Sequence, residues 1–245
     1  MKTKFLTTAA VLALSLSTGA QASLEARTGG MVYDTDNNIT WAADANLFQT
    51  QAASNTNLVS EIITANGGVI LDTPNYYDNP ASSGSHTLTV ADFNTTTGTM
   101  TWFGAQAWAN NLSLGGYTDW SLPSTDPALT GFNQKGSQMG DLFYNQLGGV
   151  SSTSIATTHN GNYYLFSKVQ SDVYWSGSEY APGPYNAWDF VTDAGYQFNV
   201  NKSTKHYAWA VRPGDVAAVP VPGAFWLFGS ALVGLMGLKR RGSIG

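Results

Sequence analysis

Residues 101–123 read TWFGAQAWANNLSLGGYTDWSLP, and this stretch joins a helical pattern to an extended one. Thr101 suits a helix N-cap, and two glycines at 115–116 end the apolar run. The apolar stripe recurs at helical spacing and falls on Trp102, Ala105, Ala109 and Leu112, with Trp108 beside it. We expect a helix over 101–112 that packs into the core, followed by an extended aromatic segment over 117–123.

Further helices are expected on both sides of this stretch. Residues 137–147 carry an apolar stripe, and Gly148 is placed to end the helix. That stripe consists of Met139, Leu142, Phe143 and Leu147. Residues 58–64 predict a shorter helix, ended by glycines at 67–68. In the Thr-, Asn- and Gly-rich region around it, we expect a surface loop over 78–86 and a strand from 87 that leads into a turn.

Near the N-terminus, residues 31–46 read MVYDTDNNITWAADAN and predict a β-hairpin. Asp and Asn form Asx turns and tolerate left-handed backbone, which suits the DTDNN stretch at 34–38. The same stretch resembles the start of a calcium loop. However, Ile39 stands where an EF-hand has glycine, and Ala45 stands where it has the bidentate glutamate. We therefore favour a turn over a calcium site.

The second half of the chain is rich in short strand patterns. Runs that begin at residues 163, 172, 186, 196 and 206 alternate with Gly- and Asn-containing turns about 10 residues apart. This spacing is typical of an antiparallel sheet. Trp175, Trp188 and Trp209 recur along it, one per predicted strand. The order of the predicted elements, a hairpin, two helices and then a strand-rich second half, predicts the α+β fold class.

Both ends of the chain predict export. Two lysines within residues 1–4, an apolar run at 5–16 and the small residues Ala20 and Ala22 are typical of a signal peptide over 1–22. Residues 219–238 hold no charge, and twenty residues are enough for a helix to cross a bilayer core of roughly 30 Å. A basic triplet, which the positive-inside rule places in the cytoplasm, follows at Lys239, Arg240 and Arg241. Residues 23–218 would then form an ectodomain outside that membrane.

The expected ectodomain is acidic and lacks cysteine. It holds six basic residues and all sixteen acidic ones, a net charge of −10, which argues against nucleic acid or anionic lipid as a partner. The balance is compatible with divalent cations or with an uncharged hydrated polymer. The three histidines, His86, His159 and His206, are too far apart in sequence to suggest a metal cage or a catalytic triad. We expect no cofactor, and calcium is not supported by any motif.

Several motifs are spaced along the chain: MVYD and ITW at 31–41, MTW at 100–102, GYTDWSLP at 116–123, YWSGS at 174–178 and AVRP at 210–213. Together they resemble a known family, the C-terminal domain of the bacterial collagen-like adhesin Lcl. The similarity covers most of residues 30–214. The family usually has arginine where this chain has Ser121, and often has serine where it has Gly177.

The order of motifs also resembles C-type-lectin-like and formylglycine-generating-enzyme-like domains. This resemblance implies two helices packed on twisted antiparallel strands. The cysteines that formylglycine chemistry needs are absent, and only Ala187-Trp188-Asp189 resembles a lectin calcium motif.

The tail resembles the PEP-CTERM class of sorting signals: a proline motif, a membrane helix and a basic end. The motif here is Val219, Pro220, Val221 and Pro222, a VPxP variant that lacks the usual glutamate. The resemblance implies two partners, signal peptidase at the N-terminus and an exosortase that cuts the tail. The implied location is the inner membrane first, then the cell surface or the extracellular matrix.

Two classes of function remain after these observations, and the first is an exported polysaccharide-binding or adhesive protein. Aromatic faces stack on sugar rings, so the candidate ligand residues are Trp175, Tyr180, Tyr185 and Trp188, with the loop 180–186 as the ligand edge. The same composition also suits a structural envelope protein without a ligand.

The second class is an enzyme, which we do not expect. A polysaccharide hydrolase would need a carboxylate pair, for which Asp119 with Asp141, or Glu179 with Asp189, are the candidates. No GxSxG or HExxH motif occurs.

Overall fold

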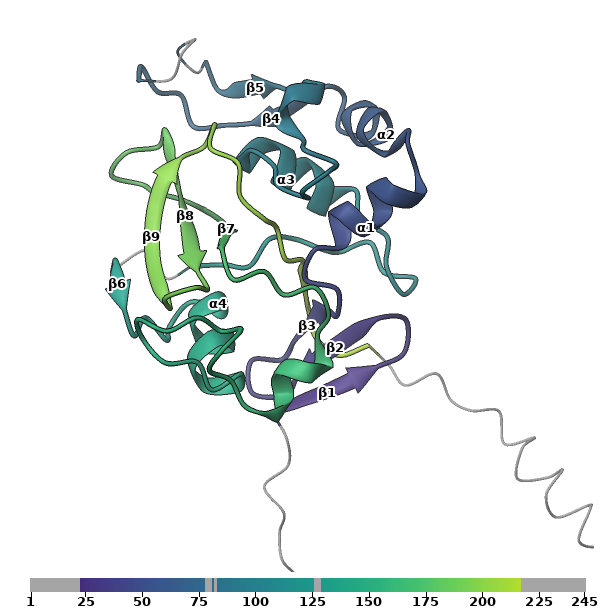
Figure 1. Ribbon diagram of the computed structural model, residues 1–245. Coiled ribbons are helices and arrows are strands. Elements are labelled where there is room, and N and C mark those ends of the chain that lie inside the picture. Colours follow the sequence, from purple (N-terminus) through teal and green to yellow (C-terminus); the bar gives the residue numbers. More distant parts are fainter. Residues whose placement is uncertain (1–22, 78–80, 82, 126–128, 217–245) are drawn as a thin grey trace, which may run out of the picture.

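The computed structural model describes residues 23–77, 81, 83–125 and 129–216, which form an α+β domain (Figure 1). Four α-helices and three antiparallel sheets make up this part of the chain. The predicted fold class is confirmed at this level. The expectations for residues 1–22 and for the tail at 219–241 lie outside the described residues. Within the described ranges, no helix is both long enough and apolar enough to cross a membrane.

The first sheet joins the two ends of the described chain. Its strand order is β1-β2-β3-β10, with bounds Leu24–Arg27, Met31–Asp34, Ile39–Ala42 and Val211–Pro213. The hairpin predicted at 31–46 is confirmed as β2 and β3, with Asp34 opposite Ile39. Asp34 Oδ1 accepts hydrogen bonds from the backbone of Asp36 and Asn37, both at 3.0 Å, and Asn38 takes a left-handed φ of 51°.

The second sheet has the order β6-β9-β8-β7 and contains most of the predicted strand region. Its strands are Gly131–Phe132, Tyr196–Asn201, Asn186–Val191 and Val173–Glu179. The strand expected at 163–169 is wrong, because Gly161–Leu165 forms the 3₁₀ helix η3, which starts where the Asn160 side chain accepts a hydrogen bond from Asn162 N. Residues 206–210 make only isolated bridges, so the last predicted strand shortens to β10.

The helices lie in two groups. α1 (Leu47–Ser54) and α2 (Leu58–Ala65) pack near α3 (Trp102–Asn110), while α4 (Gln138–Asp141) continues into a π-helical turn at Leu142–Gln146 (Figure 1). The helices at 58–64, 101–112 and 137–147 were predicted, whereas α1 was missed. Part of the predicted loop at 78–86 is wrong, because β5 (Ser85–Thr87) pairs there with β4 (Val69–Leu71). The strand expected from residue 87 is replaced by the 3₁₀ helix η1, Val90–Asp92.

Helix α3 is fixed at its start by a buried polar contact. Thr101 Oγ1 accepts a hydrogen bond from Gly104 N at 3.2 Å and donates one to Asp92 Oδ1 at 2.8 Å. Gly104 lies against Asp92, and a β-carbon at this position would come within 2.7 Å of the Asp92 carbonyl oxygen. The helix therefore needs glycine here in order to approach η1.

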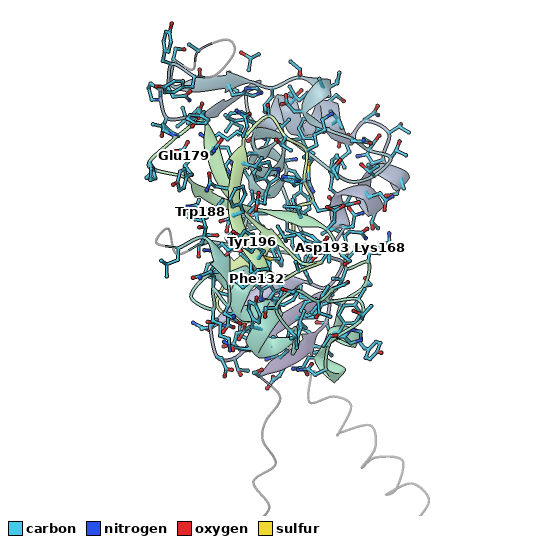
Figure 2. All side chains as sticks on the ribbon, turned by 60° about the vertical axis from the view of Figure 1, so that its left-hand side comes forward. Phe132, Lys168, Glu179, Trp188, Asp193 and Tyr196 are labelled. Atoms are coloured by element: carbon cyan, nitrogen blue, oxygen red, sulfur yellow. The ribbon has the colours of Figure 1, made fainter. Side chains whose placement is uncertain are left out.

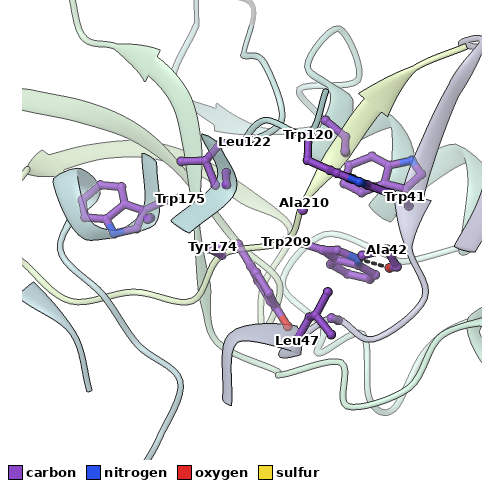
Figure 3. Packing of buried hydrophobic residues seen from close by; sticks show 14 of the residues in the cluster. Trp41, Ala42, Leu47, Trp120, Leu122, Tyr174, Trp175, Trp209 and Ala210 are labelled. Atoms are coloured by element: carbon purple, nitrogen blue, oxygen red, sulfur yellow. Dashed lines mark hydrogen bonds between the residues drawn. The ribbon is translucent and has the colours of Figure 1, made fainter. Parts of the chain in front are cut away.

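Tryptophan dominates the core. All seven tryptophans of the described residues are buried, and three of them donate their indole N–H to a backbone carbonyl far away in sequence. Trp209 bonds Ala42 at 2.8 Å, as Figure 3 shows. Trp102 bonds Ser176 and Trp175 bonds Met100, both at 2.9 Å. These bonds link α3, both large sheets and the segment before β10 into one core.

Candidate binding site

The two tryptophans predicted to bind a ligand are not at the surface. Trp175 and Trp188 are both buried, and the Trp175 indole is held by its bond to Met100. Neither ring presents a face on which a sugar could stack, so the structure corrects this part of the expectation. The alternation of side chains between the two faces of a strand does not show which of these faces the rest of the fold covers. Here both faces of the sheet are covered near these residues.

The loop 180–186 is a tight turn, as its Pro and Gly residues predict. Tyr180 N donates to Asn186 O at 3.0 Å, and Gly183 N donates to Tyr180 O at 2.9 Å. The ring of Tyr180 meets the buried indole of Trp188 edge-on, with centroids 5.2 Å apart. Tyr185 faces away from this contact, toward a second loop. Both tyrosines are half-buried: Tyr180 packs on Trp188 and supports the turn, whereas the ring of Tyr185 contacts the second loop.

The second loop supplies aromatic residues that the sequence analysis missed. Tyr76 and Tyr77 are 87% and 76% exposed, and the Tyr77 ring lies 5.4 Å from that of Tyr185. Tyr76 and Tyr77 meet edge-on at 6.1 Å. We call Tyr76, Tyr77 and Tyr185 the tyrosine cluster. The pair of adjacent tyrosines in a Pro- and Asn-containing loop was the available signal in the sequence.

A buried lysine contacts the segments that carry the tyrosine cluster. Lys202 is 1% exposed, and its Nζ bonds Asp72 and also Glu179 Oε1, the latter at 2.6 Å. The ammonium group lies 4.7 Å from the centroid of the Trp102 ring. Burial alone would raise the pKa of Glu179, but hydrogen bonds from Lys202 and Thr73 outweigh burial and lower that pKa. The lysine is therefore the cation of a mostly buried three-charge network.

The same network joins the two tyrosine loops. Lys202 N donates to Tyr185 O at 3.1 Å, which fixes the loop 180–186. Thr73 N donates to Glu179 Oε1 at 3.3 Å, and the Thr73 hydroxyl donates to Oε2 of the same carboxylate. Since Asp72 and Thr73 immediately precede the loop of Tyr76 and Tyr77, the network holds both loops at one end of the sheet.

The first candidate carboxylate pair does not form a site. Asp119 accepts two bonds from Arg212, at 2.8 and 2.9 Å, and this pair holds the GYTDWSLP and AVRP motifs together. Asp141 accepts bonds from Asn37, Gln146 and Asn145 near the β2–β3 turn. The two carboxylates are thus committed to different partners in different parts of the fold.

The second candidate pair is separated in the same way. Glu179 belongs to the Lys202 network, whereas Asp189 is buried beside His206, with Oδ2 at 3.9 Å from Nε2 and Oδ1 without a hydrogen bond. Burial raises the pKa of Asp189 to about 7 and lowers the pKa of His206 to about 4. Between those two pKa values, therefore, both groups are mainly neutral in the folded protein.

The described ranges contain no cluster of metal ligands, and the cavity found in the core is small. Among those residues, no three His, Cys, Asp or Glu side chains come together as metal ligands would. A core cavity of about 10 Å³ lies between the π-helical turn and Trp209, and its lining includes Met139, Leu142 and Phe143. A space of this size is about that of one water molecule, so the exposed tyrosine cluster is the better candidate for ligand contact.

Comparison with known families assigns the domain. The Lcl C-terminal domain family matches residues 30–212, a range that includes the tyrosine cluster and Lys202. This chain belongs to the Lcl C-terminal domain family. The predicted resemblance is thereby confirmed for the domain, and the family indicates an adhesin-like extracellular domain. No curated protein and no solved structure matches this Lcl C-terminal domain.

The Lys202 network yields a stability prediction. Lys202→Met should lower the free energy of unfolding by about 3–5 kcal/mol, because it leaves two carboxylates without their buried cation. Chemical denaturation of the wild type and the variant measures this loss. Lys205→Met is the matched control, since Lys205 is exposed and should change stability little. Adding Asp72→Asn and Glu179→Gln to Lys202→Met should restore part of the lost free energy of unfolding, because no buried carboxylate then lacks a cation. A Lys202→Met protein as stable as the wild type would contradict the role of the network.

The buried Asp189 predicts a specific dependence of stability on pH. A raised folded-state pKa means that the folded protein binds more protons than the unfolded chain, so this residue lowers the free energy of unfolding as pH rises from about 4 to about 7. His206, whose folded-state pKa is lowered, has the opposite effect between about 4 and 6.5, and the two largely cancel.

Asp189→Asn should therefore reveal the contribution of His206. Denaturation at intervals from pH 4 to 7.5 should give a free energy of unfolding that rises by a few kcal/mol, to order of magnitude, up to about pH 6.5. The wild-type profile over the same range should be flatter. Asp193→Asn, at an exposed turn, is the control. Parallel profiles for wild type and Asp189→Asn would show that Asp189 titrates normally.

Proposed function

We propose that this chain is an exported cell-envelope or extracellular-matrix protein whose Lcl C-terminal domain binds polysaccharide through the tyrosine cluster. The observation that carries the proposal is that two exposed tyrosines, Tyr76 and Tyr77, lie beside the half-buried Tyr185 in a protein whose described tryptophans are all buried. Large rings left in water and grouped on one surface are typical of a recognition site. The position of these rings on two braced loops limits the entropy lost on binding.

The chemistry of the cluster suits an uncharged sugar polymer. A tyrosine ring offers an apolar face for the C–H groups of a sugar, and its hydroxyl can donate or accept a hydrogen bond. Residues 23–218 carry a net charge of −10, so a strongly anionic polymer would be repelled. We therefore place neutral polysaccharides ahead of sulfated ones as ligands.

The cluster lies far from the ends of the described domain. Arg27 bonds Asp215, at 2.8 and 2.9 Å, and so ties β1 to the last described residues. Figure 1 places β1 at one end of the molecule and β4 and β5, which flank the loop of Tyr76 and Tyr77, at the opposite end. With an anchor at residues 219–241, the cluster would face away from the membrane, as an adhesive surface requires.

The export and sorting steps are part of the same proposal. Residues 1–22 would be removed by signal peptidase, and the VPxP tail would insert in the inner membrane until an exosortase cuts it. The support is the sequence pattern of both ends. We also propose a C-type-lectin-like arrangement for the domain, on the order of α3, the WSLP segment, α4, β7 and β10 along the chain.

A structural envelope protein without a ligand is the alternative, and the closed, tryptophan-rich core is what supports it. A hydrolase is less favoured, because the four candidate carboxylates are bonded elsewhere or buried in pairs with other groups. We propose a binding protein rather than an enzyme.

The binding proposal predicts the effect of removing the tyrosine rings. The triple variant Tyr76→Ala, Tyr77→Ala and Tyr185→Ala should bind polysaccharide at least about tenfold more weakly, since central aromatic contacts are each worth 1 kcal/mol or more. Tyr164→Ala is the matched control, because Tyr164 is 77% exposed but packs on His159 instead. Binding to neutral and sulfated polysaccharides is measured by titration calorimetry, with calcium and with a chelator.

The outcomes of this experiment separate the alternatives. Saturable binding that only the triple variant loses supports the cluster, and loss in chelator adds a metal to the site. Equal binding by the wild type and the triple variant would show that the ligand binds to another surface. Binding to no polymer would favour the structural role. Trp175→Ala is unsuitable as a test, because truncation of this buried ring would destabilise the core.

The sorting proposal predicts the mass of the mature protein. In cells that contain an exosortase, the intact mass should lack residues 1–22 and the tail beyond the VPxP motif at 219–222. In cells without the enzyme, the tail should remain and the protein should stay in the membrane fraction. A wild-type mass that retains residues 223–241 would rule out processing but leave membrane anchoring in place.

A further inference from the structure

A second group of rings, two of them exposed and one half-buried, lies on the sheet formed by β6 and β9. Phe132 of β6 and Tyr196 of β9 have ring centroids 4.8 Å apart, and Tyr196 and Phe198 have centroids 6.0 Å apart. We call these three residues the aromatic strip. Figure 2 shows Phe132 and Tyr196 side by side, with Glu179, which marks the end of β7 nearest the cluster, above them.

Strand register places the three rings on one face of the sheet. Phe132 pairs directly with Tyr196, so their side chains project to the same side. Phe198 follows Tyr196 by two residues and therefore shares that side as well. The ladder of β6 and β9 thus builds a row of rings, rather than three unrelated surface residues.

The strip is open to solvent at the margin of the sheet. Phe132 is 40% exposed and Phe198 is 46% exposed. β6 pairs only with β9 and is two residues long, so little backbone covers this margin in the described structure. Each exposed phenylalanine forgoes part of its burial energy, about 25 cal/mol per Å² of apolar surface, and a contiguous row of such residues marks an interaction surface.

The two segments that carry the strip are polar and uncharged, and Asp189, which pairs with Phe198 on the neighbouring strand, is buried. Residues 131–134 read GFNQ, and residues 196–201 read YQFNVN, so amides alternate with rings and no charge is present. The flanking charges have opposite signs, Lys135 after the first segment and Asp193 before the second. Rings bordered by amides suit the C–H faces and hydroxyls of a neutral sugar, whereas an anionic polymer or an anionic membrane would find no matching cations.

We propose that the aromatic strip is a second ring-stacking subsite for the uncharged polysaccharide, used together with the tyrosine cluster. This inference rests on the proposed function of the cluster and extends it to the class and length of the ligand. The two surfaces share a strand: Tyr196 begins β9, and Lys202, which braces Tyr185, follows its last residue. Six strand residues span roughly 20 Å, so only an extended sugar chain could touch both surfaces.

Engagement of two subsites by one chain has a measurable consequence. Once one subsite is occupied, the second meets the polymer at high effective concentration, so a long chain binds more tightly than a short one. A trisaccharide, which is too short to bridge, should depend on the cluster alone. The dependence of affinity on chain length is therefore the property that separates the strip from the cluster.

The test uses the full chain in detergent and three neutral probes: dextran, mannan and laminarin, each also as its trisaccharide. Phe132→Leu with Phe198→Leu removes the rings but keeps apolar bulk, so the sheet should stay folded. This variant should lose about tenfold or more in affinity for the polymer and leave the trisaccharide unchanged. Phe132→Tyr with Phe198→Tyr keeps the rings and should bind as the wild type. Val90→Ser, which removes an exposed apolar residue elsewhere, is the control.

The outcomes distinguish a polysaccharide subsite from a surface without a role in binding and from a contact between copies of the chain. Unchanged polymer binding by the leucine variant would overturn the strip while leaving the cluster intact. Wild-type protein that binds none of the probes, in either length, would overturn the proposed function and the strip with it. If light scattering shows a wild-type oligomer that the leucine variant breaks into monomers, the strip is a contact between copies and the inference is wrong.

Discussion

The hydrogen bonds from buried tryptophans to distant backbone carbonyls are the constraint on which the remaining structure depends. Trp102 and Trp175 tie the start of α3 to β7, and Trp209 ties the segment before β10 to β3. An indole N–H buried without a partner is costly, so each bond fixes both a side chain and the strand that accepts it. Without cysteine to cross-link the fold, these bonds and the packing of the rings connect its layers.

The same constraint explains where the molecule can bind. Tryptophans occupy the interior, which leaves tyrosine and phenylalanine as the rings that reach solvent. The positions of the loops that carry Tyr76 and Tyr185 are set by a buried cation, Lys202, which is shared by Asp72 and Glu179. The tryptophan core and the charge network together hold the two tyrosine loops in place, so the rings of the cluster are pre-organised.

Membership of the Lcl C-terminal domain family agrees with this design. A flat array of rings, without a metal cluster in the described part of the chain, suits contact with an extended polymer better than capture of a small molecule. The acidic charge of the domain further favours neutral ligands. The tyrosine cluster and the ends of the described chain lie at opposite ends of the domain, an arrangement that fits the proposed display from a membrane anchor.

The sequence by itself determined the fold class, the hairpin at 31–42, helix α3 with its Thr101 cap and the strands of 173–201, because these depend on local periodicity and turn chemistry. It also identified the family and the turn at 180–186. Only the tertiary structure decided that Trp175 and Trp188 are buried, that Tyr76 and Tyr77 join Tyr185, and that Lys202 is the cation beneath them. Those facts depend on contacts between residues that are distant in the sequence, such as Lys202 and Asp72, which are 130 positions apart, and a single sequence carries no periodic signal for such contacts.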